Sequence, residues 1–385
     1  MSATRWRIWA IYVGAMLGPF GAGLVAPMVP ELRESFGAST SAVGLGITVY
    51  HFVFAGCLLV SGTIGERFGR RRVVQLFFGL FAVSSILATL APTLALFLGA
   101  RALQGMANAF VTPLLIAGLA ELTPPDQLGR SLGIYSSFQG AGTFLAPSVA
   151  GLAADVDWRL AFIANAVLAT ALIPWAPPGE PRANAAAPPM RPLLTPRMGL
   201  LAIVGITSTT GALGIGYLVS IHSRDVLGLS ATRAGLLLAS AGLVTLALGP
   251  TLGTFVDRIG GASAGIAAAV LGGVLVALIG QVTSVGRLVP IWLAAAAATA
   301  LGLVAVQALA TVAVPENRGG AVSAVLSFRF AGYAISPLIW LPIHAGSPGA
   351  AFAGAGALMV LTVVALSALT RLDSPRQPVI ADADV

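Results

Sequence analysis

Long apolar runs follow one another along this chain with only short polar breaks between them. A helix needs about 20 apolar residues to cross a bilayer, and uncharged stretches of that length recur throughout the 385 residues. The alternating strands of a membrane β-barrel, about ten residues each, are absent. The pattern predicts an all-α membrane protein with twelve transmembrane helices. The expected spans are 8–30, 40–62, 73–91, 94–119, 131–153, 158–176, 199–221, 232–255, 262–283, 287–312, 320–343 and 349–370.

A charged phrase that recurs 191 residues later indicates an internal repeat. Both copies have the pattern G-x-x-x-[E/D]-R-x-G, and each stands between two apolar runs, where we expect a tight charged turn. Independent matches at nearly one spacing predict two pseudo-symmetric six-helix bundles. The matched segments are Gly62–Arg72 with Gly253–Gly260, Arg33–Ser39 with Arg224–Ser230, and Gly142–Pro147 with Gly332–Pro337.

The repeat divides the chain into four parts. We expect an N-terminal six-helix bundle at 1–176, a linker at 177–198, a C-terminal six-helix bundle at 199–370 and a tail at 371–385. The linker is rich in proline and alanine, which disfavours a helix there. The first apolar run has no small-residue cleavage site and is long enough to span, so we expect an uncleaved first helix.

Composition and charge agree with a membrane protein and indicate its orientation. Hydrophobic residues make up 57% of the chain and charged residues 9%, which is far too apolar for a soluble protein of this length. With the N-terminus in the cytoplasm, 14 of the 21 arginines lie on the cytoplasmic side and five on the other. This bias predicts a multi-pass inner (plasma) membrane protein with both termini cytoplasmic. The net charge of +7 thus reflects topology, and we expect no nucleic-acid partner.

Four segments resemble signatures of the major facilitator superfamily, and within it those of the twelve-helix drug:proton antiporters. They are the loop Gly62–Arg72, Arg101–Ala107, Gly142–Gly151 and Trp158–Asn165. The resemblance implies the major facilitator fold and transport of a small molecule without a cofactor. Two departures stand out. Glu66 replaces the usual aspartate of the loop, and alanines 146 and 150 replace two glycines of the export signature.

The resemblance also implies that the charged phrase is a conformational latch that holds one face of the protein closed. Glu66 would face the start of the eleventh helix, and Arg70 or Arg71 would meet Glu121. The alternative is that these arginines only set the topology, which suits Arg72. The expected latch residues are Gly62, Glu66, Arg67, Gly69, Arg70, Arg71, Glu121, Gly253, Asp257 and Arg258.

Two arginines fall inside expected spans. An arginine at the middle of a membrane helix costs at least about 2.5–3.5 kcal/mol, so each should face a partner or a cavity. For Arg101 the resemblance implies proton transfer or substrate contact, whereas the structural alternative is a buried arginine bonded to carbonyls and Gln104. Arg329 has Gln139 at its repeat position, so both could line a central cavity; alternatively Arg329 extends to the membrane surface.

The sequence offers few other polar groups for coupling and substrate binding. No acidic residue lies deep in a span, and His51 is the one histidine there. It is a candidate proton carrier, although a hydrogen-bonded structural role beside Tyr50 is the alternative. Without an embedded carboxylate, a neutral, zwitterionic or anionic amphiphile fits better than a cation. The cavity candidates are Tyr12, Tyr50, Phe138, Gln139, Tyr217 and 207–210.

Helices five and eleven carry small residues and proline at matching positions. Proline frees a carbonyl and bends a helix, while small residues allow close packing. These positions are therefore candidates for hinges that bend as the bundles rock, although packing alone could explain the small ones. The candidates are Gly142, Ala146, Pro147, Gly332 and Pro337.

These features together predict a secondary transporter that exports a small amphiphilic drug or metabolite in exchange for protons. The alternatives are import by proton symport and, in a different class, a receptor or scaffold that transports nothing. An enzyme is disfavoured because no embedded nucleophile–base pair or metal cluster is present, and Cys57 is the only cysteine. We expect a monomer in the lipid bilayer, with no metal and no cofactor.

Overall fold

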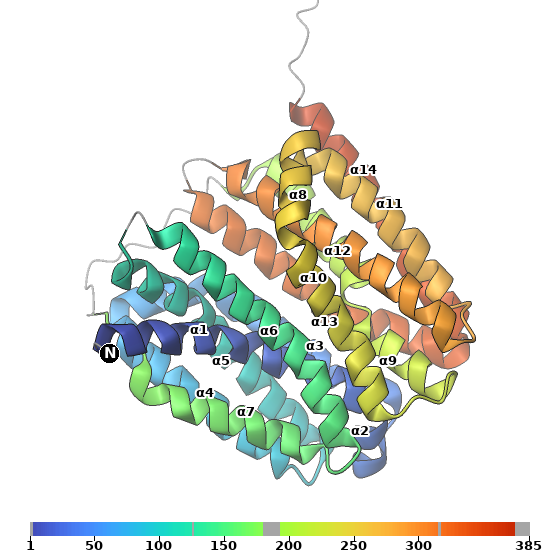
Figure 1. Ribbon diagram of the computed structural model, residues 1–385, viewed down its shortest axis with the longest axis horizontal. Coiled ribbons are helices and arrows are strands. Elements are labelled where there is room, and N and C mark those ends of the chain that lie inside the picture. Colours follow the sequence, from blue (N-terminus) through green and yellow to red (C-terminus); the bar gives the residue numbers. More distant parts are fainter. Residues whose placement is uncertain (1–2, 125–126, 180–192, 315–316, 374–385) are drawn as a thin grey trace, which may run out of the picture.

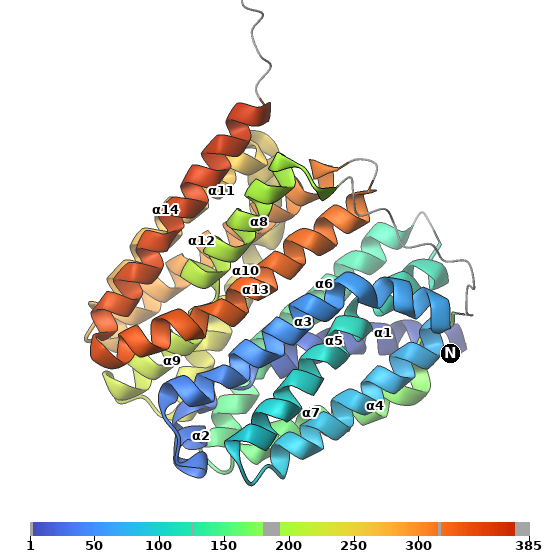
Figure 2. The ribbon, with the colours of Figure 1, turned by 180° about the vertical axis from the view of Figure 1, so that it is seen from behind.

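The computed structural model describes residues 3–124, 127–179, 193–314 and 317–373. Within these ranges the regular elements are helices, arranged as two bundles side by side (Figures 1 and 2). The first bundle consists of α1 (Ala3–Gly23), α2 (Val29–Phe36), α3 (Thr40–Phe68), α4 (Arg70–Thr89), α5 (Leu94–Leu122), α6 (Leu128–Ala154) and α7 (Arg159–Leu172). The second consists of α8 (Pro196–Ser208), α9 (Gly216–Asp225), α10 (Ala231–Ile259), α11 (Gly261–Ile279), α12 (Val285–Ala313), α13 (Arg318–Gly346) and α14 (Pro348–Asp373).

Each of the twelve expected spans falls on helical structure, and the first span of each bundle is interrupted. A 3-10 turn, Ala26–Met28, separates α1 from α2, and a π-helical turn, Thr209–Leu213, follows α8 before α9. Ten helical stretches among the described residues are long and apolar enough to cross a membrane by themselves. The other two are α6, a continuous helix that contains several glycines and serines, and the shorter stretch Arg159–Trp175.

The charged phrase is mostly helical, which corrects the expected turn. Residues 62–68 continue α3 to its end, α4 begins at Arg70, and Gly69 alone separates the two helices. The φ angle of Gly69 is +90°, and that of Gly260 at the repeat position is +85°. Such angles are open to glycine because it has no Cβ. The turn therefore reduces to one glycine in each bundle.

The repeat is visible in how the fifth and eleventh spans pack on the first and seventh. A Cβ added at Gly142 would lie 2.6 Å from the backbone oxygen of Met16, and one added at Gly332 would lie 2.6 Å from that of Ile206. Neither approach leaves room for a side chain, so both glycines are required for helix packing. The matching prolines, 147 and 337, lie within α6 and α13. Bending at these positions stays a prediction.

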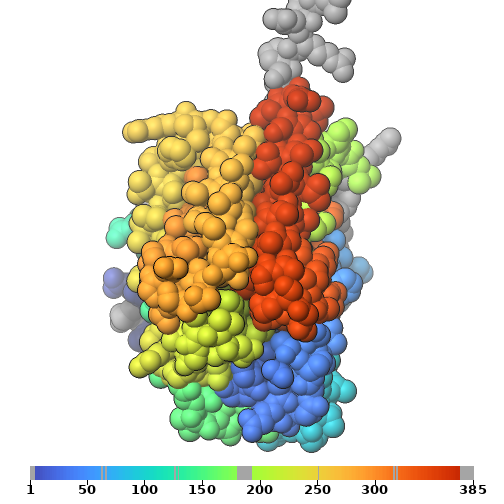
Figure 3. Space-filling view, turned by 90° about the vertical axis from the view of Figure 1, so that its right-hand side faces the viewer, coloured from blue at the N-terminus to red at the C-terminus, as the bar shows by residue number. Residues whose placement is uncertain are grey.

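The two bundles meet through two pairs of helices, α3 with α13 and α6 with α10. Near α2 and α9 the contact is close: the Cα of Gly151 would lie 3.1 Å from a Cβ added at Gly235, and the Thr48 hydroxyl donates to the Ala334 oxygen over 2.8 Å. Figure 3 views this end, and there the surfaces of the two bundles lie directly against each other. We call it the closed end.

Toward the N-terminus and the charged phrases, the helices of the two bundles diverge (Figure 1). The approach of α6 to α10 loosens at Gly140, where an added Cβ would lie 3.7 Å from Leu246. Farther along the same helices, positions 133 and 249 have no heavy atom within 4 Å of an added Cβ. We call this side of the molecule the open end.

Candidate functional site

Arg101 on α5 lies at the centre of the first bundle and is fully buried. Its Nη1 donates to the Gly21 oxygen at 2.9 Å and to Gln104 Oε1 at 2.6 Å, and its Nε donates to the Gly46 oxygen at 3.2 Å. Because α1 ends at Gly23, the Gly21 oxygen belongs to its unpaired, partly negative C-terminus. Arg101 therefore caps α1. These are the bonds to carbonyls and to Gln104 that the structural alternative for Arg101 anticipates.

A polar cluster extends from Arg101 across three helices. Ser85 of α4 accepts from Gln104 Nε2 at 2.9 Å and from Asn165 Nδ2 of α7 at 3.2 Å. The Tyr50 ring of α3 lies 4.4 Å from the Arg101 guanidinium carbon, a cation–π distance. Among the described residues, Arg101 Nη2 and Asn165 Oδ1 are buried without a hydrogen-bond partner. The cluster thus links α1, α3, α4, α5 and α7 around one guanidinium.

A second cluster lies where α3 meets α13, and we call it the interface cluster: His51, Arg329, Phe330 and Tyr333. The His51 ring stacks on Tyr333 with centroids 5.2 Å apart and on Phe330 with centroids 5.9 Å apart. Its Nδ1 donates to the Ile47 oxygen at 2.9 Å, which fixes the proton on that nitrogen. Tyr333 interacts electrostatically with Arg329, one turn away on α13. The cluster therefore joins the two bundles.

Several expected cavity residues are held within helix packing instead. The Tyr217 side chain is 2% exposed, and its hydroxyl lies 3.0 Å from Ser336 Oγ. Thr210 in the π-helical turn donates to the Gly332 oxygen, while its own backbone oxygen accepts from Trp340 Nε1 at 2.7 Å. These side chains tie the interrupted seventh span to α13. Any contact with substrate in another conformation stays a prediction.

The remaining cavity candidates lie toward the open end. Tyr12 is buried and stacks on Phe138, with centroids 5.8 Å apart, and Gln139 is half-buried on α6. The threonines of the π-helical turn donate hydrogen bonds to backbone oxygens of α13, Thr209 to that of Arg329 and Thr210 to that of Gly332. π-Helical turns are frequent at functional sites.

At the open end, the described part of the expected latch forms contacts within the first bundle. Arg70 Nη1 donates to Glu121 Oε2 at 2.6 Å and to the Pro178 oxygen at 3.4 Å. Of the two arginines considered, it is thus Arg70 that meets Glu121, whereas Arg71 is exposed. Arg67, Asp257 and Arg258 are also exposed. Nothing is described of the surroundings of Gly62, nor of the side chains of Glu66 and of Arg318 at the start of α13.

The closed end carries polar contacts between the bundles that the sequence did not reveal, and we call them the closed-end lock: Glu31, Asp155, Arg224 and Thr232. Arg224 Nη1 lies 2.6 Å from Glu31 Oε1 and also donates to the Pro27 oxygen. Both side chains are mostly buried, at 17% and 20% exposure, so solvent screens this pair less than a surface pair.

Asp155 makes the second contact of the closed-end lock. Its carboxylate accepts from the Thr232 hydroxyl at 2.5 Å, the Thr232 amide at 3.1 Å and the Ala231 amide at 3.2 Å. A residue of the first bundle thus caps the N-terminus of α10 in the second. These hydrogen bonds, that of the Thr232 hydroxyl above all, hold the pKa of Asp155 below its ordinary value, with a smaller contribution from Arg224.

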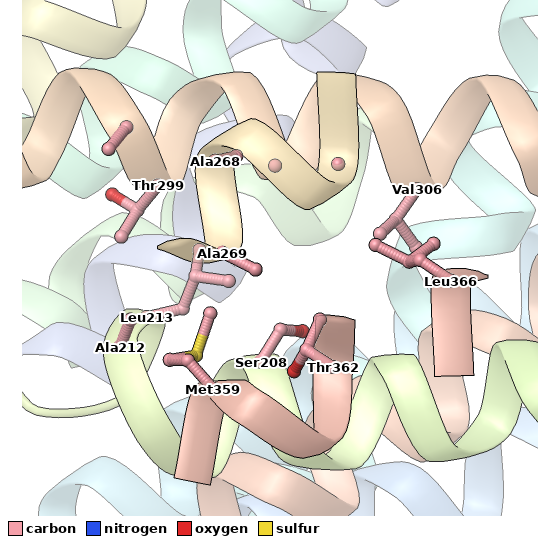
Figure 4. A pocket seen from close by; sticks show the side chains of 13 residues that line it. Ser208, Ala212, Leu213, Ala268, Ala269, Thr299, Val306, Met359, Thr362 and Leu366 are labelled. Atoms are coloured by element: carbon pink, nitrogen blue, oxygen red, sulfur yellow. The ribbon is translucent and has the colours of Figure 1, made fainter. Parts of the chain in front are cut away.

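Two cavities lie away from these clusters. Figure 4 shows a cavity of about 20 Å³ in the second bundle, between the π-helical turn, α11, α12 and α14. Met359, Ser208 and Thr362 border it, and it has room for about one water molecule. A groove of about 630 Å³ lies between α4 and α7, lined almost entirely by apolar side chains such as Leu90 and Val167. Neither contains a charged side chain.

Comparison with known proteins identifies the fold that carries these clusters. The family model described as Major Facilitator Superfamily matches residues 11–291. The chain belongs to the major facilitator superfamily. This major facilitator protein therefore has the multi-pass membrane fold of its family. The expected family and the all-α membrane fold are confirmed.

Several curated relatives of this facilitator are drug-resistance or export proteins. The puromycin resistance protein of Streptomyces alboniger is 30% identical over 166 residues, which are 43% of this chain and 33% of the relative. The tetracenomycin C resistance and export protein of Streptomyces glaucescens is 31% identical over 169 residues, which are 43% of this chain and 31% of the relative. The matched part thus spans about a third of each relative.

Solved structures confirm the fold over nearly the whole facilitator. A transporter of the POT family, crystallised with a thioalcohol-conjugated peptide, superimposes with a TM-score of 0.81 over 95% of this chain and 96% of that chain. The two sequences are 13% identical, so the likeness concerns the fold alone.

Sequence reasoning missed several residues of this facilitator that form its polar clusters. Ser85 and Asn165 bond within the N-terminal cluster, and Tyr333 links His51 to Arg329. Asn165 belongs to a segment that resembled a family signature, which was the available signal. For Tyr333 the available signal was Arg329, which lies one turn earlier and has a polar residue, Gln139, at its repeat position. No signal in the sequence indicated the pairing of Glu31 with Arg224.

Proposed function

We propose that this facilitator exports a small amphiphilic drug or metabolite in exchange for protons by alternating access. The observation that carries the proposal is the uneven interface between the bundles. They are locked at one end, diverge at the other, and hold a polar cluster between them. A site that opens to one side at a time is what a rocking transporter needs.

The distribution of arginines supports an orientation with both termini in the cytoplasm of the inner (plasma) membrane. In this orientation the open end faces the cytoplasm, and the structure is the inward-facing state. A molecule from the cytoplasm can then approach the interface cluster while the closed-end lock separates it from the outside. One chain supplies both bundles of the path, which supports a monomer.

Export rather than import is supported by two of the relatives, which are named as resistance or export proteins. For the coupling ion, His51 is the candidate. It is the one of three histidines that packs at the interface of the bundles, where a change of conformation alters its surroundings. The other two, His222 and His344, pack against Phe352 in the second bundle.

The charged phrases supply the opposite lock in this proposal. When the open end closes, Glu66 would meet the start of α13 while Arg70 keeps its contact with Glu121. A carboxylate near a helix N-terminus is stabilised by the helix dipole, and arginine pairs well with carboxylates. The two states would then be held by different contacts at opposite ends.

Accumulation of diverse dyes and antibiotics in efflux-deficient bacteria tests the direction and the coupling. We expect cells that express the protein to accumulate less of at least one compound, and a protonophore to abolish the difference. Higher accumulation would indicate import by symport instead. Unchanged accumulation with correctly inserted protein would contradict broad export and favour a role without transport.

Cross-linking of the closed end tests alternating access itself. In a Cys57→Ser background, Glu31→Cys and Arg224→Cys place two thiols where the ion pair stood. A short thiol-specific cross-linker should stop transport, and a reductant should restore it. Each single-cysteine variant with the same reagent is the control. Transport that continues in the cross-linked protein would show that the closed end need not open.

A further inference from the structure

Arg329 differs from Arg101 in how the protein satisfies its charge. Arg101 is fully buried and donates to two backbone oxygens and to Gln104. Arg329 is half-buried, and its Nε is a buried atom without a hydrogen-bond partner among the described residues. Arginine at membrane depth is expensive unless a partner is present. Each guanidinium thus keeps one unpartnered nitrogen among the described residues, Nη2 of Arg101 and Nε of Arg329, but only Arg329 belongs to a side chain that is partly exposed.

No carboxylate among the described residues lies at the depth of Arg329. The acidic residues that the structure describes all lie within three residues of a helix end or between helices. Arg329 is 11 residues after the start of α13 at Arg318, which places it about 16 Å along the helix. Two backbone oxygens near it, those of Gly205 and of Arg329 itself, accept from the Thr209 hydroxyl at 2.7 and 2.9 Å.

The surroundings of Arg329 suit an anion with an apolar body. Tyr333 interacts with the guanidinium and carries a hydroxyl that can donate. Beyond it, the His51 and Phe330 rings are nearly parallel, at 13° to each other. Guanidinium groups bind carboxylates through two parallel hydrogen bonds, and ring faces pack on flat apolar groups. The cluster thus combines an anion-binding group with an aromatic surface.

We propose that the interface cluster binds the acidic group of the transported molecule, which assigns the substrate to the amphiphilic organic anions. Arg329 holds the carboxylate, Tyr333 adds a hydrogen bond, and the rings of His51 and Phe330 pack on the apolar body. The assignment rests on the proposed transport function and specifies its substrate class. Arg101 takes no part in this contact, because its guanidinium is enclosed in the first bundle.

The test is binding of three fluorescent probes that share one dansyl group and differ in charge. They are dansylglycine, an anion; dansylamide, which is neutral; and dansylcadaverine, a cation. Fluorescence titration of the purified protein should show the tightest binding for dansylglycine. R329Q should weaken that binding by at least about tenfold, as expected for loss of a charge-assisted pair, and leave dansylamide unchanged.

Two further variants keep the test decisive. Y333F removes one hydroxyl and should weaken dansylglycine alone, even where R329Q fails to fold. R287Q removes an exposed arginine at the start of α12 and is the matched control for loss of charge. No binding by the wild type, equal binding of dansylglycine and dansylamide, or R329Q and Y333F that both bind dansylglycine like the wild type would overturn the proposal.

The cellular measurement separates this proposal from the proposed function. Preferential binding of dansylglycine, lost in R329Q, together with unchanged accumulation of every compound in cells supports the anion site and contradicts export. Proton-dependent efflux of neutral or cationic compounds, with no preference for dansylglycine in vitro, supports export and overturns the anion site.

Discussion

At the scale of single residues, the two embedded arginines show how one side chain can be satisfied in two ways. Arg101 is paired with the C-terminus of α1, whose carbonyls are free because the helix ends at Gly23. The helix terminus carries partial negative charge and so replaces a carboxylate. Arg329 lies against the last turn of α8 at Gly205, but the Gly205 oxygen already accepts from the Thr209 hydroxyl. Arg101 finds the free carbonyls of α1 because the first span is broken after Gly23. The sequence around Arg101 does not indicate that break.

Arg101→Ala should lower both thermal stability and transport. The substitution leaves the Gly21 and Gly46 oxygens without their donors, and a buried unpaired polar group costs about 1–3 kcal/mol. Arg101→Lys keeps the charge but lacks the planar fork, so it should recover only part of the stability. Melting temperatures in detergent and efflux in cells measure the two effects separately.

The comparison of these measurements decides the role of Arg101. Loss of transport at unchanged melting temperature would show a direct role in proton transfer or substrate contact. Normal melting and normal transport together would show that the bonds to Gly21 and Gly46 contribute little.

At the scale of helices, the closed end depends on how α6 meets α10. Asp155 caps α10 from the other bundle, and Gly151 and Gly235 bring the two helices together. The hydrogen bonds of Asp155 and the packing of Gly151 on Gly235 both act over short distances, so a small displacement of the helices breaks them. We therefore expect this helix pair to separate when the closed end opens.

Acid should loosen the closed end through Asp155. Hydrogen bonds in the closed state lower the pKa of its carboxyl, so the ionised group stabilises that state above the ordinary carboxyl range, near pH ~3.9. This contribution is full at neutral pH and is lost as the pH falls through the lowered pKa. Asp155→Asn should remove the dependence. Labelling of a cysteine at position 154, next to Asp155 and outside this hydrogen-bond set, with a disulfide reagent that reacts in acid, at pH values from neutral to acidic, measures it.

A side chain at Gly235 should separate the same helices without any change of charge. A Cβ there would meet the Pro147 oxygen, so Gly235→Val should destabilise the closed end by about 1–3 kcal/mol. Gly249→Val on the same helix faces open space and is the matched control. Thiol accessibility at the closed end should rise only in Gly235→Val; equal labelling of the two variants would contradict the proposed packing.

Much of this architecture could be predicted because the repeat and the apolar periodicity are local in sequence. Gly69 and Gly260 mark the same turn in both bundles, and their pattern alone located it. The extent of the turn was wrong because charged residues continue a helix as readily as they end one at a membrane surface. The interface cluster escaped prediction because His51 and Tyr333 are far apart in sequence, on different bundles, and one sequence does not fix their register.

At the scale of the whole molecule, the two ends carry different kinds of contact. The closed end has an ion pair between bundles, Glu31 with Arg224, whereas the described ion pair at the charged phrase, Arg70 with Glu121, lies within one bundle. In the proposed cycle, only the charged phrase can hold the cytoplasmic side shut. The balance of the two states should therefore respond to changes at either end.

Glu66→Ala should shift the protein toward the inward-facing state, because the proposed contact with the start of α13 forms only when the open end closes. Cysteine accessibility measured from the two sides of the membrane reports the shift, with Arg72→Ala as a control at a position suited only to topology. Unchanged labelling in Glu66→Ala would leave the charged phrase with a topological role.

The absence of acidic residues from the interior of the described helices also has an electrical consequence. If an anion binds at Arg329, the loaded interface cluster is close to neutral, whereas the empty interface cluster is positive. A membrane potential that is negative inside would then draw the empty site back toward the cytoplasm. Moving one charge through the whole field amounts to about 2.3 kcal/mol per 100 mV. The voltage would thus power the return half of the cycle, and collapsing it at constant pH in proteoliposomes should slow repeated turnover more than a single round of export.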